Sequence, residues 1–93
     1  MILDKTKNYK IRVTPEQSRR IQQYLFDHNI ASWSGDKSIR HEEQPFLYIN
    51  NGRLLHGSIE STFIEYSDTE ITPEQILNDD KLTKLFKKLT GEK

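Results

Sequence analysis

The dipeptide Asn51-Gly52 limits the fold of this chain more than any other feature of its sequence. Asparagine followed by glycine between two apolar runs is the strongest short-range signal of a β-hairpin, because both residues of a type I′ turn need a positive φ. The two runs are residues 45–50 before the turn and residues 53–56 after it. A two-residue turn fixes the register of the two strands. We therefore expect Ile49 to pair with Leu54, Tyr48 with Leu55 and Leu47 with His56.

This register places apolar side chains on both faces of the hairpin. The two sets are Leu47, Ile49 and Leu54 on one face, and Phe46, Tyr48 and Leu55 on the other. A sheet with one face in water would alternate apolar and polar residues more regularly. Either helices therefore cover both faces, or one face is a contact surface for a partner.

The tetrapeptide Thr-Pro-Glu-Gln occurs twice, at residues 14–17 and 72–75. Threonine is a good helix N-cap, proline is tolerated at the first helical position, and a glutamine three residues after the cap can close a capping box. Both copies follow a short extended stretch, and the helix after the first copy is expected to stop near Asn29. We interpret the repeat as a strand-to-helix junction that is used twice and has no chemical role.

The remaining segments are expected to complete the secondary structure. Residues 9–13 alternate as a half-buried strand, with Lys10 and Arg12 on its wet side. Residues 30–33 are expected as a short strand and residues 36–44 as a polar loop. A second helix is expected to open at residues 73–77.

The chain ends in an amphipathic segment over residues 79–90, where Asp79 or Asp80 is expected to cap a separate helix. Four apolar residues share one helical face, and lysines lie away from it: Leu82, Leu85, Phe86 and Leu89. A stripe of this size is rarely left in water, so we expect it to dock on the core or to self-associate rather than to bind a membrane.

Together these elements predict one α+β domain over residues 1–93. Its compact core is expected over residues 8–77, with a small antiparallel or mixed sheet and one packed helix. The amphipathic segment at residues 79–90 follows the core as a C-terminal helical segment.

Composition excludes several classes of protein. The formal net charge is zero, so no overall field attracts nucleic acid or membranes. The chain has no cysteine, no apolar run near the ~18–20 residues of a membrane span and no hydrophobic signal stretch at its start. A reducing cytoplasm is the expected compartment. Residues 21–78 carry three Lys/Arg against nine acids, so either the charges complement one another internally or the acidic centre meets a basic partner.

The residues that carry catalysis or bind cofactors are mostly missing. The chain has no cysteine nucleophile and no glycine-rich phosphate loop, and His28, His41 and His56 lack the close spacing of paired metal ligands. The sequence therefore predicts a protein without enzymatic activity, catalytic residues, metal or cofactor.

Candidate partner-binding residues lie in and near the hairpin: Trp33, Phe46, Tyr48, Arg53 and Leu55. Tryptophan, tyrosine and arginine are enriched at binding hot spots, although the same aromatic residues could simply form core. A nucleic-acid surface is the alternative, with basic residues of strand 9–13 beside Arg19 and bases stacked on Phe46 and Tyr48.

The order of motifs over about residues 8–77 resembles that of small accessory proteins of large tailed bacteriophages. The segments that carry the resemblance are Val13 to Gln17, Leu25-Phe26, Trp33 to Gly35, Pro45 to Ile49, Phe63 and Glu70 to Leu77. Many such phage proteins of known role bind and block a host enzyme or defence factor. The resemblance implies a phage effector in the host cytoplasm that inhibits or modulates a host protein, with a small nucleic-acid-binding regulator as the alternative. Homo-oligomers are left open.

Overall fold

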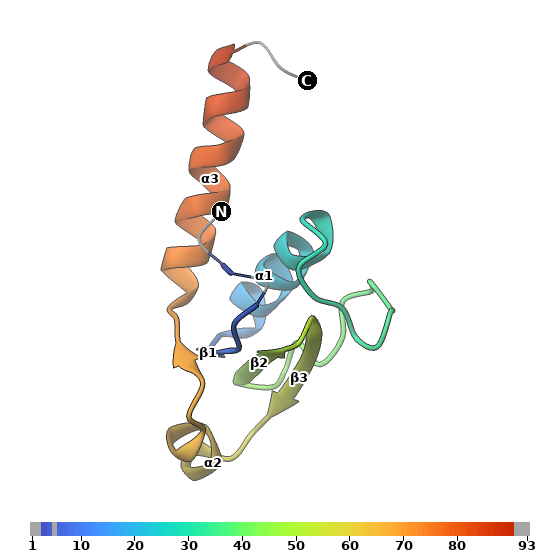
Figure 1. Ribbon diagram of the computed structural model, residues 1–93, viewed down its shortest axis with the longest axis vertical. Helices are drawn as coiled ribbons and strands as arrows, with labels where there is room; N and C mark the ends of the chain where they lie inside the picture. Colours follow the sequence, from blue (N-terminus) through green and yellow to red (C-terminus); the bar gives the residue numbers. More distant parts are fainter. Residues whose placement is uncertain (1–2, 5, 91–93) are drawn as a thin grey trace.

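The computed structural model describes residues 3–4 and 6–90, with the side chains of these residues except those of residues 83 and 86–90. Four strands and three helices follow one another along the chain (Figure 1): β1 Tyr9–Arg12, α1 Pro15–Asp27, β2 Phe46–Asn50, β3 Arg53–Gly57, α2 Glu60–Glu65, β4 Thr69–Glu70 and α3 Pro73–Thr90. The strands form one mixed sheet in the order β3-β2-β1-β4, in which β1 is antiparallel to β2 and parallel to β4. The predicted α+β class is confirmed.

The β2–β3 hairpin has the predicted turn and register. Asn51 and Gly52 both have positive φ, at 50° and 78°. Ile49 pairs with Leu54, and the pairs continue in register as far as Phe46 with Gly57. The turn chemistry and the apolar pattern therefore agree on one pairing.

Helix α1 begins and ends where its sequence signals lie. The Thr14 hydroxyl accepts the Gln17 amide at 3.2 Å, and the Gln17 side chain accepts the Thr14 amide at 3.0 Å, which closes the capping box. At the other end Asn29 has a φ of 54°. Its amide donates to Phe26 and the next amide donates to Leu25, which is the hydrogen-bond pattern of a Schellman motif.

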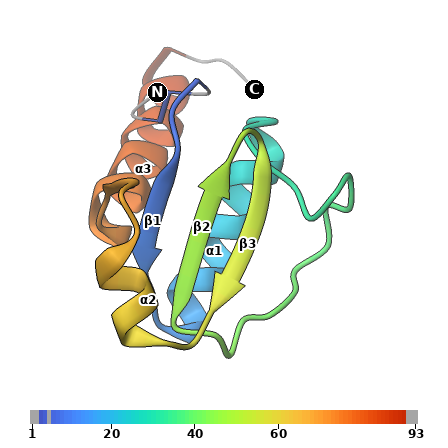
Figure 2. The same ribbon diagram turned by 60° about the horizontal axis from the view of Figure 1, so that its bottom comes forward.

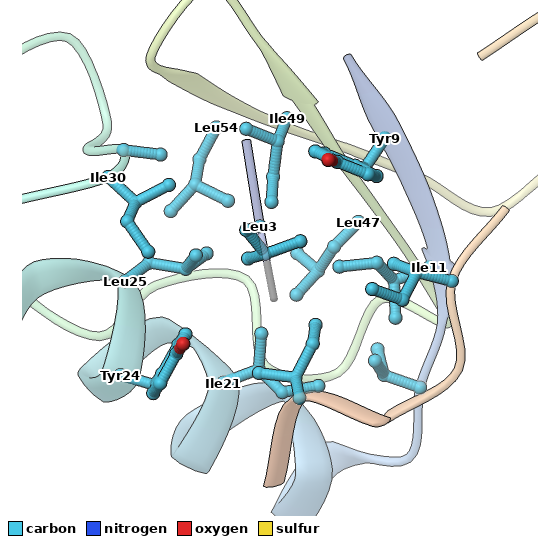
Figure 3. Packing of buried hydrophobic residues seen from close by; sticks show 14 of the residues in the cluster. Leu3, Tyr9, Ile11, Ile21, Tyr24, Leu25, Ile30, Leu47, Ile49 and Leu54 are labelled. Atoms are coloured by element: carbon cyan, nitrogen blue, oxygen red, sulfur yellow. The ribbon is translucent and has the colours of Figure 1, made fainter. Parts of the chain in front are cut away.

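Helix α1 packs on one face of the sheet, which we call the inner face. Figure 2 looks at the sheet with α1 behind it. In Figure 3, Ile21 and Leu25 of α1 lie across the core from Leu47 and Leu54 of the hairpin. The fully buried apolar side chains of this layer are Ile11, Ile21, Leu25, Leu47, Leu54 and Ile76.

The loop between α1 and β2 is anchored by one buried glutamine. The Gln22 amide group donates to the Arg40 carbonyl at 2.8 Å, and its oxygen accepts from Trp33 Nε1 at 2.9 Å and from the Arg40 amide at 3.0 Å. The expected strand at residues 30–33 reduces to isolated bridges at Ser32 and Trp33, because a tight turn with positive φ at Ser34 follows at once.

Helix α2 was not predicted from the sequence, and it covers the second face of the sheet, which we call the outer face. The Phe63 ring stacks on Phe46 at 4.6 Å between centroids, and Tyr48 lies beside Tyr66 at 4.8 Å. Phe46, Tyr48 and Phe63 form a buried cluster of their own. Helices therefore lie on both faces of the hairpin.

Helix α3 is one continuous helix, so the expected separate helix beginning at Asp79 or Asp80 is wrong. No proline or glycine interrupts residues 74–90. Asp79 instead accepts the Tyr24 hydroxyl at 2.8 Å, and Asp80 pairs with Lys84 at 3.1 Å within the helix. The capping box at Thr72 is confirmed, since the Gln75 amide donates to the Thr72 hydroxyl at 3.3 Å and the Thr72 amide donates to the Gln75 side-chain oxygen at 2.8 Å.

The two halves of α3 have different surroundings. Ile76 is buried in the core of the inner face together with Ile71, and the two residues lie before and after the Thr72 cap at the positions of a hydrophobic staple. The C-terminal half extends beyond the sheet and α1 (Figure 1), where Leu82 is 65% exposed and Leu85 is 50% exposed. Docking of the stripe on the core is therefore wrong for these two residues, because the helix runs past the sheet. Phe86 and Leu89 have side chains outside the described ones.

Candidate interaction surface

A buried lysine holds the C-terminal end of α2 over the outer face. Lys10 Nζ donates to the carbonyls of Phe63 at 2.7 Å and Tyr66 at 2.8 Å, and it lies 4.9 Å from the Phe63 ring centroid. These carbonyls belong to the last turn of the helix, where a cation is also favoured by the helix dipole. The prediction that Lys10 faces water is wrong, because α2 covers it and supplies its hydrogen-bond acceptors.

An arginine holds the N-terminal end of the same helix. Arg12 Nη1 lies 2.7 Å from both carboxylate oxygens of Glu60, and its guanidinium lies 4.9 Å from the Phe63 ring centroid. The hydrogen bond from Arg12 lowers the pKa of Glu60 below its ordinary range. Because α2 is only six residues long, its position depends on Lys10, Arg12 and the Phe63 contacts rather than on its own helix propensity.

Beside α2 the outer face contains a groove of about 490 Å³, which we call the outer groove. It is lined by Gln44, Tyr48, Leu55, His56, Gly57, Ser58, Ile59, Thr62 and Tyr66. A methyl group at position 57 would lie 3.3 Å from Tyr48 Cε2. Gly57 therefore allows the Tyr48 ring to approach β3 closely in the lining of the groove.

The outer groove combines exposed apolar side chains with a buried hydroxyl. Leu55 is 37% exposed and Ile59 is 60% exposed. The Tyr48 hydroxyl is buried, and no hydrogen-bond partner for it is found among the residues that the structure describes. Burial, and then the neighbouring Tyr66, raises the pKa of Tyr48, so this hydroxyl stays neutral. The groove therefore presents an uncharged, largely apolar surface.

The groove lies next to an edge of the sheet. Strand β3 is one of the two edge strands, and near the turn its edge is closed by the Ser32 carbonyl, which accepts the Leu54 amide at 2.9 Å. Peptide groups that point away from the neighbouring strand recur every second residue. The peptide groups of His56 consequently point outward, at the end of β3 that lines the groove.

Three aromatic rings fix the long loop to the rim of this site. His41 stacks on His56 with 3.8 Å between centroids, and Trp33 lies 5.1 Å from His41. Burial, and then the charge of His41, lowers the pKa of His56, while Glu43 opposes this shift. In the described part of the chain, no group of three or more potential ligands is placed to hold a metal ion.

The five predicted partner-binding residues separate in the structure. Phe46 and Tyr48 are buried beneath α2, and only the Tyr48 ring reaches the outer groove. Leu55 lines the groove, and it also lines a second hollow of about 360 Å³ that includes Arg53. Trp33 contacts the inner core and bonds to Gln22, and its ring lies 6.0 Å from that of His56 at the rim of the groove.

The residues of α2 that line the groove were not found from the sequence. Helix α2 has only six residues, so a periodic pattern within it cannot be distinguished from chance. The groove residues that belong to this helix or flank it are Ile59, Thr62 and Tyr66. The only available signal was the spacing of Ile59, Phe63 and Tyr66, which places them on one side of a helix.

The basic strip on which the nucleic-acid alternative depends has internal partners. Lys10 is bonded to α2, Arg12 to Glu60, and Arg19 lies 3.1 Å from Glu42. Phe46 and Tyr48 are covered by Phe63 and Tyr66 rather than open for base stacking.

Comparison of this chain with protein-family models, with curated proteins and with solved structures gave no match. Within the described residues, none of the helices combines the length and the apolar character needed to cross a membrane.

Proposed function

We propose that this protein is a non-enzymatic effector of a tailed bacteriophage that acts in the host cytoplasm by binding a host protein, and that it inhibits or modulates a defence or stress component. The observation that carries the binding role is the outer groove. It places exposed Leu55 and Ile59 beside an open strand edge. The phage origin and the host target depend on the resemblance in motif order.

The groove and the strand edge together favour an extended segment of the partner. Such a segment would pair with the outward-facing peptide groups at His56 and place an apolar side chain against Leu55, Ile59 and Tyr66. Main-chain hydrogen bonds would supply affinity and the groove would supply specificity. Because Lys10 and Arg12 hold α2 in place, this site is largely formed before the partner arrives, which lowers the entropic cost of binding.

The test compares two variants as baits in host lysate. Leu55→Asp/Ile59→Asp places charges on the groove, whereas Ile39→Asp changes a side chain that is as exposed as Leu55 but does not line the groove. The wild type and Ile39→Asp are expected to capture the same host protein, and the groove variant is expected to lose it. Titration calorimetry with that protein should show a loss of about 2 kcal/mol or more for the groove variant, as at other hot spots.

Two outcomes would contradict the proposal. If the groove variant binds the captured protein like the wild type, the outer groove is not the binding site. The nucleic-acid alternative is correct if capture disappears after nuclease treatment and the logarithm of the affinity for nucleic acid falls linearly with the logarithm of the salt concentration.

The variant Arg53→Ala extends the test to the second hollow. It is expected to bind the partner more weakly while its folding is unchanged.

A further inference from the structure

The most exposed large apolar side chains form two separate pairs. Among the described residues, four such side chains are exposed by half or more: Ile59 at 60%, Ile64 at 63%, Leu82 at 65% and Leu85 at 50%. The first pair flanks or belongs to α2, and the second lies on the C-terminal half of α3. A single copy of the chain leaves both pairs in water, which is unfavourable for side chains of this size.

The two pairs lie in surroundings of opposite charge. Residues 58–70, which include α2, contain four acids and no lysine or arginine, and Arg12 of β1 pairs with one of these acids, Glu60. Residues 81–90, the C-terminal part of α3, contain four lysines and no acid. Lys81 and Lys84 flank the α3 pair, and Glu65 is an exposed residue of α2. Lys84 pairs with Asp80 in its own helix, and a surface pair of this kind is weak.

The two surfaces also lie at opposite ends of the molecule. In Figure 1, α2 is at the bottom and the C-terminal end of α3 is at the top of the long axis, along which the molecule extends 46 Å. Two copies that run antiparallel about a two-fold axis would bring each α3 against the α2 of the other copy. Such an isologous arrangement makes the same contact twice and closes on itself.

We propose that this chain forms an antiparallel homodimer in which Leu82 and Leu85 of each copy pack against the α2 surface around Ile64 of the other. Lys81 and Lys84 then lie beside the acidic residues of that surface. The charge distribution favours this contact, since Lys81 and Lys84 then meet the acidic residues of the α2 surface, whereas a parallel pairing of two α3 helices would bring the lysines of both copies together. The inference does not depend on the proposed function, because Ile64 is not part of the outer groove lining.

The absence of cysteine from the sequence allows a direct test by cross-linking. Two single variants, Ile64→Cys and Leu85→Cys, are purified with tags of different size, mixed and mildly oxidised. The mixed disulfide dimer is expected to form faster than either like-with-like dimer. Ile39→Cys, mixed with Leu85→Cys, is the matched control for a random encounter between exposed cysteines.

Several results would overturn the dimer. One is a Leu85→Cys disulfide with itself as the main product, which would mean that two α3 helices pair. Another is a mixed disulfide that forms no faster than with the Ile39→Cys control. A third is a wild-type chain that is monomeric in sedimentation equilibrium and instead pellets with vesicles containing phosphatidylserine, which would assign the α3 stripe to a membrane surface.

Charge exchange provides a second, independent measurement. Lys84→Glu and Glu65→Lys are each expected to weaken dimerisation by about tenfold in sedimentation equilibrium, because each places like charges at the contact. The chain that carries both changes is expected to recover dimerisation, since the exchanged charges meet again in a reciprocal dimer. If the double variant is no better than the single variants, the proposed pairing of these surfaces is wrong.

Discussion

Replacement of Lys10 by methionine tests the contact that holds α2 on the sheet. Methionine keeps most of the length and apolar character of the side chain but removes the ammonium group. The carbonyls of Phe63 and Tyr66 then lose donors that lie at 2.7 and 2.8 Å. The Phe63 carbonyl is in a buried contact, so water cannot readily replace the lost hydrogen bond.

The expected loss follows from these contacts. Hydrogen bonds from a charged donor contribute about 1.5–3 kcal/mol each, and a cation over an aromatic ring contributes about 0.5–2 kcal/mol. Burial of the ammonium offsets part of this gain. We therefore expect Lys10→Met to lower the free energy of unfolding by about 2–4 kcal/mol. Most of this loss arises because the α2 carbonyls are left without hydrogen-bond donors.

Urea denaturation measures this loss in Lys10→Met and, as a control, in Lys7→Met, which changes an exposed lysine three residues earlier. Amide hydrogen exchange provides a local measurement, because Phe63 and Tyr66 donate backbone hydrogen bonds within the α2 segment. In Lys10→Met, the protection of these two amides against exchange should fall more than the protection of the α1 amides. A change within about 0.5 kcal/mol of the wild type, as for an ordinary surface substitution, would refute the structural role of Lys10.

Three further predictions concern other elements of the fold. Tyr48→Phe should leave stability unchanged or raise it by about 1 kcal/mol in urea denaturation, because it removes a buried hydroxyl without a described hydrogen-bond partner; a clear loss would mean that the hydroxyl has a partner. Thr14→Ala and Thr72→Ala should each cost about 0.5–2 kcal/mol through the lost helix cap, and a stable Thr14→Ala that no longer binds its partner would contradict a purely structural role of the repeat. The lowered pKa of His56 means that the unfolded chain binds its proton more readily than the folded one. Its contribution to stability is therefore complete above the ordinary pKa of 6.5 and falls as the pH drops below that value. The fall should be smaller in His56→Gln, and an identical pH dependence in the two proteins would contradict it.

The sequence by itself determined those features that depend on neighbouring residues. The capping boxes at Thr14 and Thr72 are complete within four residues, so each can be predicted without knowledge of the rest of the molecule. The same holds for the Asn51-Gly52 turn, which requires positive φ and thereby sets the pairing of β2 with β3. The division of the hairpin into two apolar faces followed directly from that register.

Tertiary structure decided the features that depend on distant residues. Helix α2 is too short to be stable alone, and it exists because Lys10 and Arg12, about fifty residues earlier, bind its two ends. The outer groove could not be predicted for the same reason, since one of its sides is made of α2. The role of Asp79 likewise depends on a distant residue, since its carboxylate accepts the Tyr24 hydroxyl at 2.8 Å and joins α3 to α1. Local signals fix where a helix can begin, but contacts between segments far apart in the chain decide whether a marginal helix forms and which surface it leaves open.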